Sequence, residues 1–200
     1  MDATAIDFWF DFASPYAFFA AREVDALAAR HGRTVNWRPI LLGPVFERTG
    51  VRPLTLSPIK GDYARHDWAR MARARGLEFT MPDPHPFPTL APARAFWWLV
   101  ERDPGQARAL ARAVFDALFL EARPAQNADV VLAIAAGLDI DPVALADGMA
   151  EATTKDRLRY ETEDAIARGV CGAPFFMVDG EPFFGADRMA QMEAWLRAPW

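Results

Sequence analysis

Ser14 is the residue of this sequence that is best placed to do chemistry. It follows a run of alternating apolar residues and precedes apolar residues at spacings of three and four, so it lies where a strand ends and a helix begins. The free N–H groups and the dipole of a helix N-terminus favour a bound anion by about 0.3–1 kcal/mol at an exposed site. We therefore expect an anionic group to bind beside the Ser14 hydroxyl, although a serine here also fits a plain N-cap.

The second candidate feature is Gly172-Ala173-Pro174, which stands directly before a predicted strand. Proline is tolerated at the first residue of a strand, because its missing donor can fall outside the ladder. A cis bond before Pro174 would expose the N–H and the C=O of Ala173 to a ligand. We expect this bond to be cis, because it lies between a glycine and a predicted hairpin.

The histidines, the one cysteine and the net charge argue against other kinds of site. His31, His66 and His85 lie far apart, with no partner three or four residues away, so we expect no metal site. Cys171 is the one cysteine, so no intramolecular disulfide can form, and we expect its side chain to fill a small buried apolar space. A formal net charge of −5 and a pI of about 5.2 argue against a nucleic-acid binder.

A strand over residues 6–12 is predicted to lead the chain to Ser14. Its apolar side chains alternate with Asp7, Trp9 and Asp11, which predicts a strand with one strongly apolar face. The chain therefore reaches Ser14 at the carboxyl end of a strand, where ligands collect in open α/β sheets.

A helix over 15–31 and a strand over 34–39 complete a β-α-β unit with a right-handed crossover. The following hundred residues carry helical spacings and no convincing strand, so we predict an all-helical insertion over 46–152. A length of 200 residues then suits one α/β domain, formed by 1–45 and 153–200, that carries this insertion.

The C-terminal part returns to mixed structure. Thr153-x-x-Asp156 predicts a capping box that opens a polar helix. An Asp-Gly pair predicts a tight hairpin between strands over 175–178 and 182–184. We expect Asp187 to cap a last helix, which gives the order β-α-β, helical insert, α-β-β-α.

This order resembles the thioredoxin fold in its DsbA-type form, an α/β fold with an inserted helical domain. Within that group, four strings are similar to those of the 2-hydroxychromene-2-carboxylate isomerases and the kappa-class glutathione transferases. The strings are Asp11-Phe12-Ala13-Ser14-Pro15-Tyr16, Lys60-Gly61-x-Tyr63, Gly172-Ala173-Pro174 and Phe184-Gly185-Ala186-Asp187-Arg188. The resemblance runs from Ile6 to about Leu196 and is strongest at the two ends.

The resemblance implies a binding site for glutathione. Ser14 takes the place of the serine that hydrogen-bonds the glutathione thiol, and Ala17 stands where redox relatives carry a second cysteine, so no dithiol can form. Asp187 matches the aspartate that receives the γ-glutamyl ammonium, with the N–H groups of Gly185 and Ala186 presented to the γ-glutamyl carboxylate.

Three further residues of the implied glutathione site come from the same strings. Ala173, before Pro174, matches the residue whose backbone pairs with the cysteinyl unit like an added strand, and Phe184 opens the last matching string. Lys60 matches the lysine that contacts the glycyl carboxylate. Two plainer alternatives stay open. Lys60 also fits a solvated surface charge, and Asp187 also fits a simple N-cap.

Four residues are expected to shape the pocket for the second substrate: Tyr16, Phe46, Val51 and His85. The family often has asparagine at Val51, whose side chain contacts the ligand, and a basic residue can stand at Phe46. Ala173 is smaller than the usual valine, and 81–88, which carries His85, departs from the isomerase pattern. These departures are compatible with glutathione binding, but they argue against 2-hydroxychromene-2-carboxylate as the second substrate.

The resemblance implies a glutathione-dependent isomerase that acts in the degradation of aromatic compounds. Its thiolate would add to an unsaturated carbon of a small aromatic substrate, the new single bond would rotate, and elimination would return the glutathione. The alternatives are a kappa-type transferase that releases a stable conjugate and a thioredoxin-fold binding protein without catalysis. A homodimer is also implied.

The N-terminus has neither the basic region nor the apolar run of a secretory signal. The longest uncharged apolar run, 130–138, is about half as long as a membrane span requires. We therefore expect a soluble cytoplasmic protein with no membrane partner.

Overall fold

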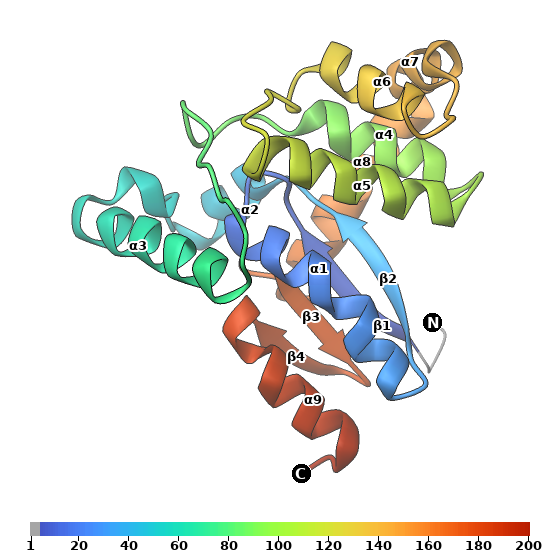
Figure 1. Cartoon of the computed structure of the whole chain (residues 1–200). Helices are drawn as coiled ribbons and strands as arrows, with labels where there is room; N and C mark the ends of the chain where they lie inside the picture. The colour runs from blue at the N-terminus through green and yellow to red at the C-terminus, as the bar shows by residue number, and fades with distance from the viewer. Residues whose placement is uncertain (1–4) are drawn as a thin grey trace.

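Residues 5–200, which are the part of the chain that the computed structural model describes, contain a four-stranded sheet with the order β2-β1-β3-β4 (Figure 1). β1 (Ala5–Phe10) pairs in parallel with β2 (Thr34–Pro39) and antiparallel with β3 (Phe175–Val178). β3 in turn pairs antiparallel with β4 (Glu181–Phe184). The thioredoxin-like α/β fold predicted from the sequence is confirmed.

The helices join these strands in chain order. They are α1 (Pro15–Arg30), α2 (Leu42–Thr49), α3 (Pro58–Ala74), α4 (Leu90–Val100), α5 (Pro104–Phe119), α6 (Ala128–Ala136), α7 (Pro142–Ala150), α8 (Ala152–Ala167) and α9 (Met189–Arg197), with short 3-10 turns η1 (Leu54–Leu56) and η2 (Ala186–Arg188). All elements from α2 to α8 lie between β2 and β3, so the predicted helical insertion is present. The sequence reading missed α2, and the insertion bounds 46 and 152 stay a prediction.

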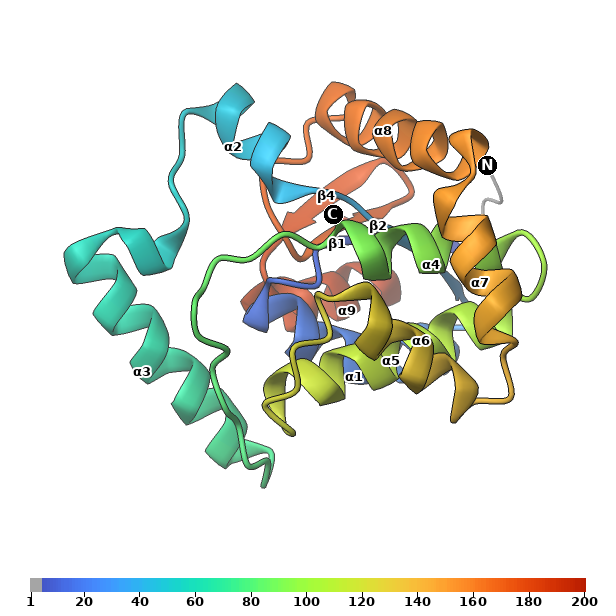
Figure 2. The ribbon, with the colours of Figure 1, turned by 90° about the horizontal axis from the view of Figure 1, so that it is seen from above.

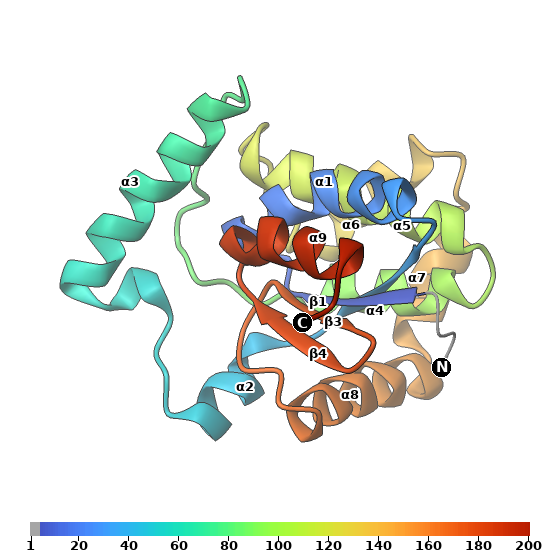
Figure 3. The ribbon, with the colours of Figure 1, turned by 90° about the horizontal axis from the view of Figure 1, so that it is seen from below.

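The strongly apolar face of β1 predicted from the alternation is present, and the sequence analysis missed that the opposite face is buried too. Phe8 stacks with Phe176 of β3 at 5.2 Å between ring centroids, on the face covered by α1 and α9. Trp9 points the other way and packs with Val45 of α2 and Ala165 of α8. Figure 3 shows α1 and α9 on one side of the strands and α2 and α8 on the other. Two helical layers around one sheet explain why a tryptophan stands among the aspartates of this strand.

The charges on the second face of β1 are paired. Arg38 of β2 donates to Asp7 of β1 (2.9 Å) and to Glu161 of α8 (3.0 Å). Arg157 lies 2.7 Å from the other Glu161 oxygen, and Glu161 is almost completely buried. Buried charges need such partners, because an unpaired ion would lose its hydration without compensation. This network joins the sheet to α8.

Two local predictions for the ends of helices and strands are confirmed. Ser14 is the N-cap of α1, with Pro15 at its first position. Asp179 and Gly180 both adopt positive φ (53° and 91°) in the turn between β3 and β4, as a two-residue hairpin turn requires.

Three other local predictions were wrong. Glu151, and not Thr153, holds the N-cap position of α8, and the Thr153 hydroxyl donates to the Glu151 carboxylate (3.1 Å), so the capping box does not form. Asp187 lies inside η2, whose N-cap position is held by Gly185. Cys171 is exposed rather than buried, because it precedes β3 in a surface connection.

α3 and the connection that follows it form one side of the molecule. Figure 2 shows α3 at the edge and the connection over 75–89 running between α3 and the rest of the protein. The Tyr16 hydroxyl donates to Asp67 of α3 (2.9 Å), and Thr80 in the connection donates its N–H to Phe119 of α5 (2.7 Å). These contacts bring the insertion to the N-terminal end of α1.

Candidate active site

The two features singled out in the sequence meet in the structure. The Ser14 hydroxyl donates to the backbone oxygen of Ala173 (3.0 Å), a residue 159 positions away in the sequence. The same oxygen of Ser14 accepts from the N–H of Ala17 in the first turn of α1 (3.2 Å). The Ala173–Pro174 bond is cis, as expected. Ser14 is 6% exposed, so its hydroxyl stands at the edge of the core with a fixed set of partners.

The hairpin of β3 and β4 continues this arrangement. The N–H of Gly185 donates to the oxygen of Pro174 (3.0 Å). Of the two N–H groups expected to bind the γ-glutamyl carboxylate, that of Gly185 is therefore bonded within the protein, which leaves that of Ala186. The ring of Phe184, 52% exposed, lies against Gly172 so closely that a Cβ there would stand 2.7 Å from it. The sequence reading missed the reason for this glycine, which is the close approach of a side chain from the next strand.

Asp187 presents an exposed carboxylate near the start of α1. Its side chain is 74% exposed, and the guanidinium of Arg188 lies 3.6 Å from it. The pKa of Tyr16 is raised, first by burial, then by its hydrogen bond to Asp67, and also by the negative charges of Asp67 and Asp187. Asp187 is therefore within electrostatic range of the residue that follows Pro15 in α1.

His85 lies against the turn that carries Ser14. Its Nε2 is 2.7 Å from the backbone oxygen of Ala13, and its Nδ1 is 3.0 Å from the hydroxyl of Thr55. Its ring contacts those of Trp68 and Phe87 edge-on. Burial lowers the pKa of His85, so its neutral form is favoured. Both ring nitrogens are thus engaged within the protein.

Asp11 is a buried acid that the sequence reading did not include in the site. Its carboxylate accepts from the N–H of Ala13 (2.8 Å), the N–H of Leu42 at the start of α2 (2.8 Å) and the hydroxyl of Thr89 before α4 (3.0 Å). Burial raises the pKa of Asp11, and these three bonds lower it. A carboxylate directly after a mostly apolar strand and three residues before Ser14 was the available signal.

The remaining predicted residues lie farther along the insertion. Phe46 is half-buried in α2, Val51 is 53% exposed after it, and Lys60 is exposed near the start of α3. Within residues 5–200, no hydrogen bond, ion pair or ring contact joins them to Ser14. Gly61 explains the local packing, because a Cβ there would stand 2.8 Å from the backbone oxygen of Leu54.

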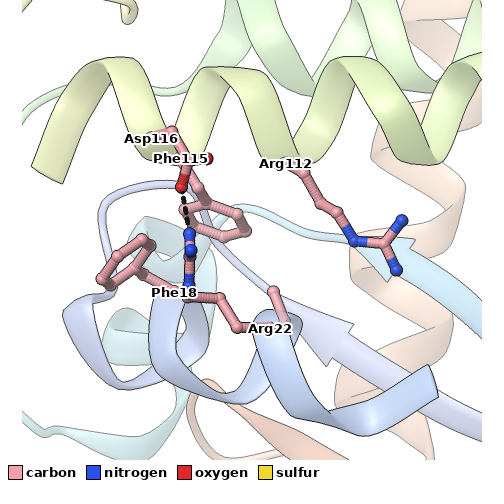
Figure 4. Close-up of a pocket in the computed structure, with 6 residues that line it drawn as sticks. Phe18, Arg22, Arg112, Phe115 and Asp116 are labelled. Atoms are coloured by element: carbon pink, nitrogen blue, oxygen red, sulfur yellow. Dashed lines mark hydrogen bonds and ion pairs between the residues drawn. The ribbon is translucent and has the colours of Figure 1, made fainter. Parts of the chain in front are cut away.

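Two cavities lie elsewhere. One, of about 200 Å³, lies between α1 and α5, and the ion pair of Arg22 and Asp116 spans it above the rings of Phe18 and Phe115 (Figure 4). A groove of about 470 Å³ follows β2 beside α4 and α5. Ser14 lines neither of these two volumes.

Two further features bear on function. In the part of the chain that the structure describes, no three histidine, cysteine or acidic side chains come together as a metal site. Nor does any helix in residues 5–200 have the length and apolar character needed to cross a membrane.

Comparison with known proteins places the chain among relatives of one fold. A family model described as a DSBA-like thioredoxin domain matches residues 5–197. The chain is 27% identical to a 2-hydroxychromene-2-carboxylate isomerase of Pseudomonas putida, over 94% of this chain and 92% of the relative. It is 28% identical to glutathione S-transferase kappa 2 of Caenorhabditis elegans, over 97% and 92%. A solved 2-hydroxychromene-2-carboxylate isomerase superposes with a TM-score of 0.86 at 25% identity, covering 95% of this chain and 93% of that one.

Proposed function

Because the chain belongs to the DsbA-like thioredoxin family, we propose that it is a glutathione-dependent isomerase of the 2-hydroxychromene-2-carboxylate isomerase type, in which Ser14 holds the sulfur of glutathione. The observation that carries this proposal is the hydrogen bond between Ser14 and Ala173, since it joins a hydroxyl at a helix N-terminus to the backbone that leads into β3. The two kinds of group suit a thiol and the peptide beside it.

The groups around this bond fit the chemistry of glutathione. A hydroxyl and a helix N-terminus suit a thiolate, and the backbone of Ala173 suits an extended peptide. The exposed carboxylate of Asp187 suits an ammonium, and Lys60 suits a carboxylate. Ala17 stands one turn after Ser14, so the chain lacks the paired cysteines that thiol–disulfide exchange needs.

The bond between Ser14 and Ala173 also sets a condition for catalysis. A hydroxyl has one proton, and in this structure Ser14 gives it to the Ala173 oxygen. A peptide N–H that pairs with Ala173 would satisfy that oxygen, so the Ser14 proton would become free to turn to the sulfur. Ser14 would then stabilise the sulfur only when the peptide beside it is in place.

The energy required is within reach of this site. Glutathione supplies a nucleophilic sulfur, and a thiol with a pKa near 8.5 is only a few per cent thiolate at pH 7. A pKa lower by two units needs about 2.7 kcal/mol. A hydrogen bond to a charged group contributes about 1.5–3 kcal/mol and a helix N-terminus up to about 2 kcal/mol. The Ser14 hydroxyl and the start of α1 suffice together.

A kappa-type transferase is the second candidate, supported by the 28% identical nematode relative. The two differ in what happens to glutathione. An isomerase returns it, so its concentration stays constant through many turnovers, whereas a transferase consumes one molecule for each product. Mass balance of glutathione during turnover of 2-hydroxychromene-2-carboxylate separates them. A small aromatic substrate, a cytoplasmic location and a homodimer belong to the same proposal and are supported by the family resemblance.

Calorimetric titration with glutathione tests the binding site itself. We expect Asp187→Ala to weaken binding about fivefold, or roughly 1 kcal/mol, because an exposed ion pair contributes little more. Glu181→Ala, which removes an exposed carboxylate at the start of β4, is the matched control and should leave the dissociation constant unchanged. No binding by the unmodified protein would remove the proposal, and an unchanged constant in Asp187→Ala would place the ammonium elsewhere.

A further inference from the structure

Ala13, the residue before Ser14, is held at both of its backbone polar groups. Its N–H donates to Asp11 (2.8 Å), two residues earlier in the same turn. Its oxygen lies 2.7 Å from Nε2 of His85, which comes from the connection after α3, 72 residues later. One of these contacts comes from within the turn and the other from the insertion, and the residue that follows Ala13 is Ser14.

We propose that His85 is a positioning residue for Ser14, which it holds in place through the oxygen of Ala13. The inference rests on the function proposed above for Ser14 and adds a residue that does not itself touch the ligand. His85 would set where the Ser14 hydroxyl stands relative to Ala173, and so how well that hydroxyl reaches a bound sulfur.

The donor in this bond is fixed by the partners. A backbone oxygen can only accept, so Nε2 of His85 carries the proton and donates it to Ala13. Nδ1 then faces the hydroxyl of Thr55 (3.0 Å), which also lies 3.3 Å from the backbone oxygen of His85, so its one proton has two acceptors. Because Nε2 carries the proton of the neutral ring, the lone pair of His85 is on Nδ1, which faces Thr55.

Packing fixes the plane of the imidazole. The ring centroid of His85 lies 5.6 Å from that of Phe87, with the planes at 86°, and 6.3 Å from that of Trp68, at 62°. Trp68 in turn contacts Tyr16 at 5.7 Å. A ring held on two sides delivers its N–H in one direction, so the position of Ala13 depends on the insertion as well as on the sheet.

Substitutions at His85 can separate the hydrogen bond from the bulk of the ring. His85→Gln keeps an N–H donor at similar reach, and His85→Leu removes it. Met81→Ala is the matched control, because it reduces packing in the same connection at a half-buried residue that is not one of the two whose rings pack on His85.

Amide hydrogen exchange in the glutathione-free protein is the first measurement. The N–H of Ser14 donates to the Asp11 oxygen (2.9 Å), and that of Ala17 donates to Ser14. We expect His85→Leu to speed exchange at both amides about tenfold relative to the amides of α6, and His85→Gln and Met81→Ala to leave it within about threefold. Equal rates in all variants would overturn the proposal, as would acceleration in His85→Gln equal to that in His85→Leu.

The second measurement is an ultraviolet titration of the thiol of bound glutathione. We expect His85→Leu to raise its pKa in the same direction as Ser14→Ala, and His85→Gln to restore the wild-type value. The double variant Ser14→Ala/His85→Leu should match Ser14→Ala alone, because a positioning residue has no effect once the group it positions is gone. Additive shifts would contradict action through Ser14. If the wild-type protein does not bind glutathione, the proposed function fails, and hydrogen exchange still decides the role of His85.

Discussion

The turn around Ser14 and the segment 51–63 are built in opposite ways. Hydrogen bonds with Ala173 before β3, with His85 in the connection after α3 and with Asp11 just after β1 hold the turn, and Ser14 is almost fully buried. The segment 51–63, by contrast, exposes five large apolar side chains: Val51, Leu54, Leu56, Ile59 and Tyr63. The difference suggests a division of roles. The groups proposed to hold the sulfur are part of the core. Of the residues expected to shape the second-substrate pocket, Val51 stands on the exposed segment, where sequence change costs little in folding, whereas Tyr16 and His85 are half-buried beside the turn.

Asp11→Ala should have the largest effect on the buried turn around Ser14. It leaves the N–H groups of Ala13 and Leu42 and the hydroxyl of Thr89 without their acceptor, and each buried unsatisfied group costs about 1–3 kcal/mol. We expect the free energy of unfolding, measured with urea, to fall by about 3 kcal/mol or more. Asp62→Ala, an exposed acid of α3, should change it by less than about 0.5 kcal/mol. Equal effects would show that Asp11 does not hold the turn.

The pH dependence of the same variant has a defined sign. Burial raises the pKa of Asp11, so the folded protein keeps a proton on this carboxyl at pH values where the unfolded chain has lost it. This contribution to stability is present below pH 3.8 and is lost as pH rises through the folded pKa. The difference in unfolding free energy between wild type and Asp11→Ala should therefore shrink as pH rises through that window. A difference that grows with pH would mean that the hydrogen bonds outweigh burial.

Gly172→Ala tests the packing of Phe184 against the backbone next to Ala173. The new Cβ would stand 2.7 Å from the ring of Phe184, so the ring must move away from the backbone beside Ala173. We expect a loss of about 1–3 kcal/mol in unfolding free energy and weaker glutathione binding by calorimetry. Gly43→Ala in α2 is the matched control, because a Cβ there meets no atom within 4 Å. Unchanged binding in Gly172→Ala would separate Phe184 from the site.

Val51→Asn should have the smallest effect on folding. It tests whether the exposed segment 51–63 takes part in binding. The position is 53% exposed, so we expect a change of less than about 0.5 kcal/mol in unfolding free energy. The resemblance to the isomerases implies that an asparagine here contacts the ligand, so glutathione binding should tighten a few-fold. An unchanged dissociation constant would leave Val51 outside the site.

The sequence predicted those parts of the molecule that depend on neighbours in the chain. The β-α-β start, Ser14 as the N-cap of α1 and the Asp179-Gly180 turn all follow from local rules. The cap predicted at Asp187 was wrong because η2 starts at Ala186, two residues before the first position of a helix capped by Asp187.

Contacts between residues far apart in the chain could not be predicted from the sequence. The second buried face of β1 requires knowledge that α8 returns to cover Trp9. The bond from His85 to Ala13 joins residues 72 positions apart, and no spacing rule reports such a contact. Ser14 and Ala173 were singled out from local patterns, whereas their expected roles in binding glutathione came from the family resemblance.

The thiol titration of bound glutathione in wild type and Ser14→Ala tests the central claim most directly. Ser14→Ala should keep the fold, because an N-cap contributes about 1 kcal/mol. If the Ser14 hydroxyl stabilises the thiolate, its removal should raise the pKa of the bound thiol by about one unit or more, and turnover at neutral pH should fall with the thiolate fraction and recover in part at higher pH. Identical titration curves for the two proteins would contradict the account, whatever the rate of turnover.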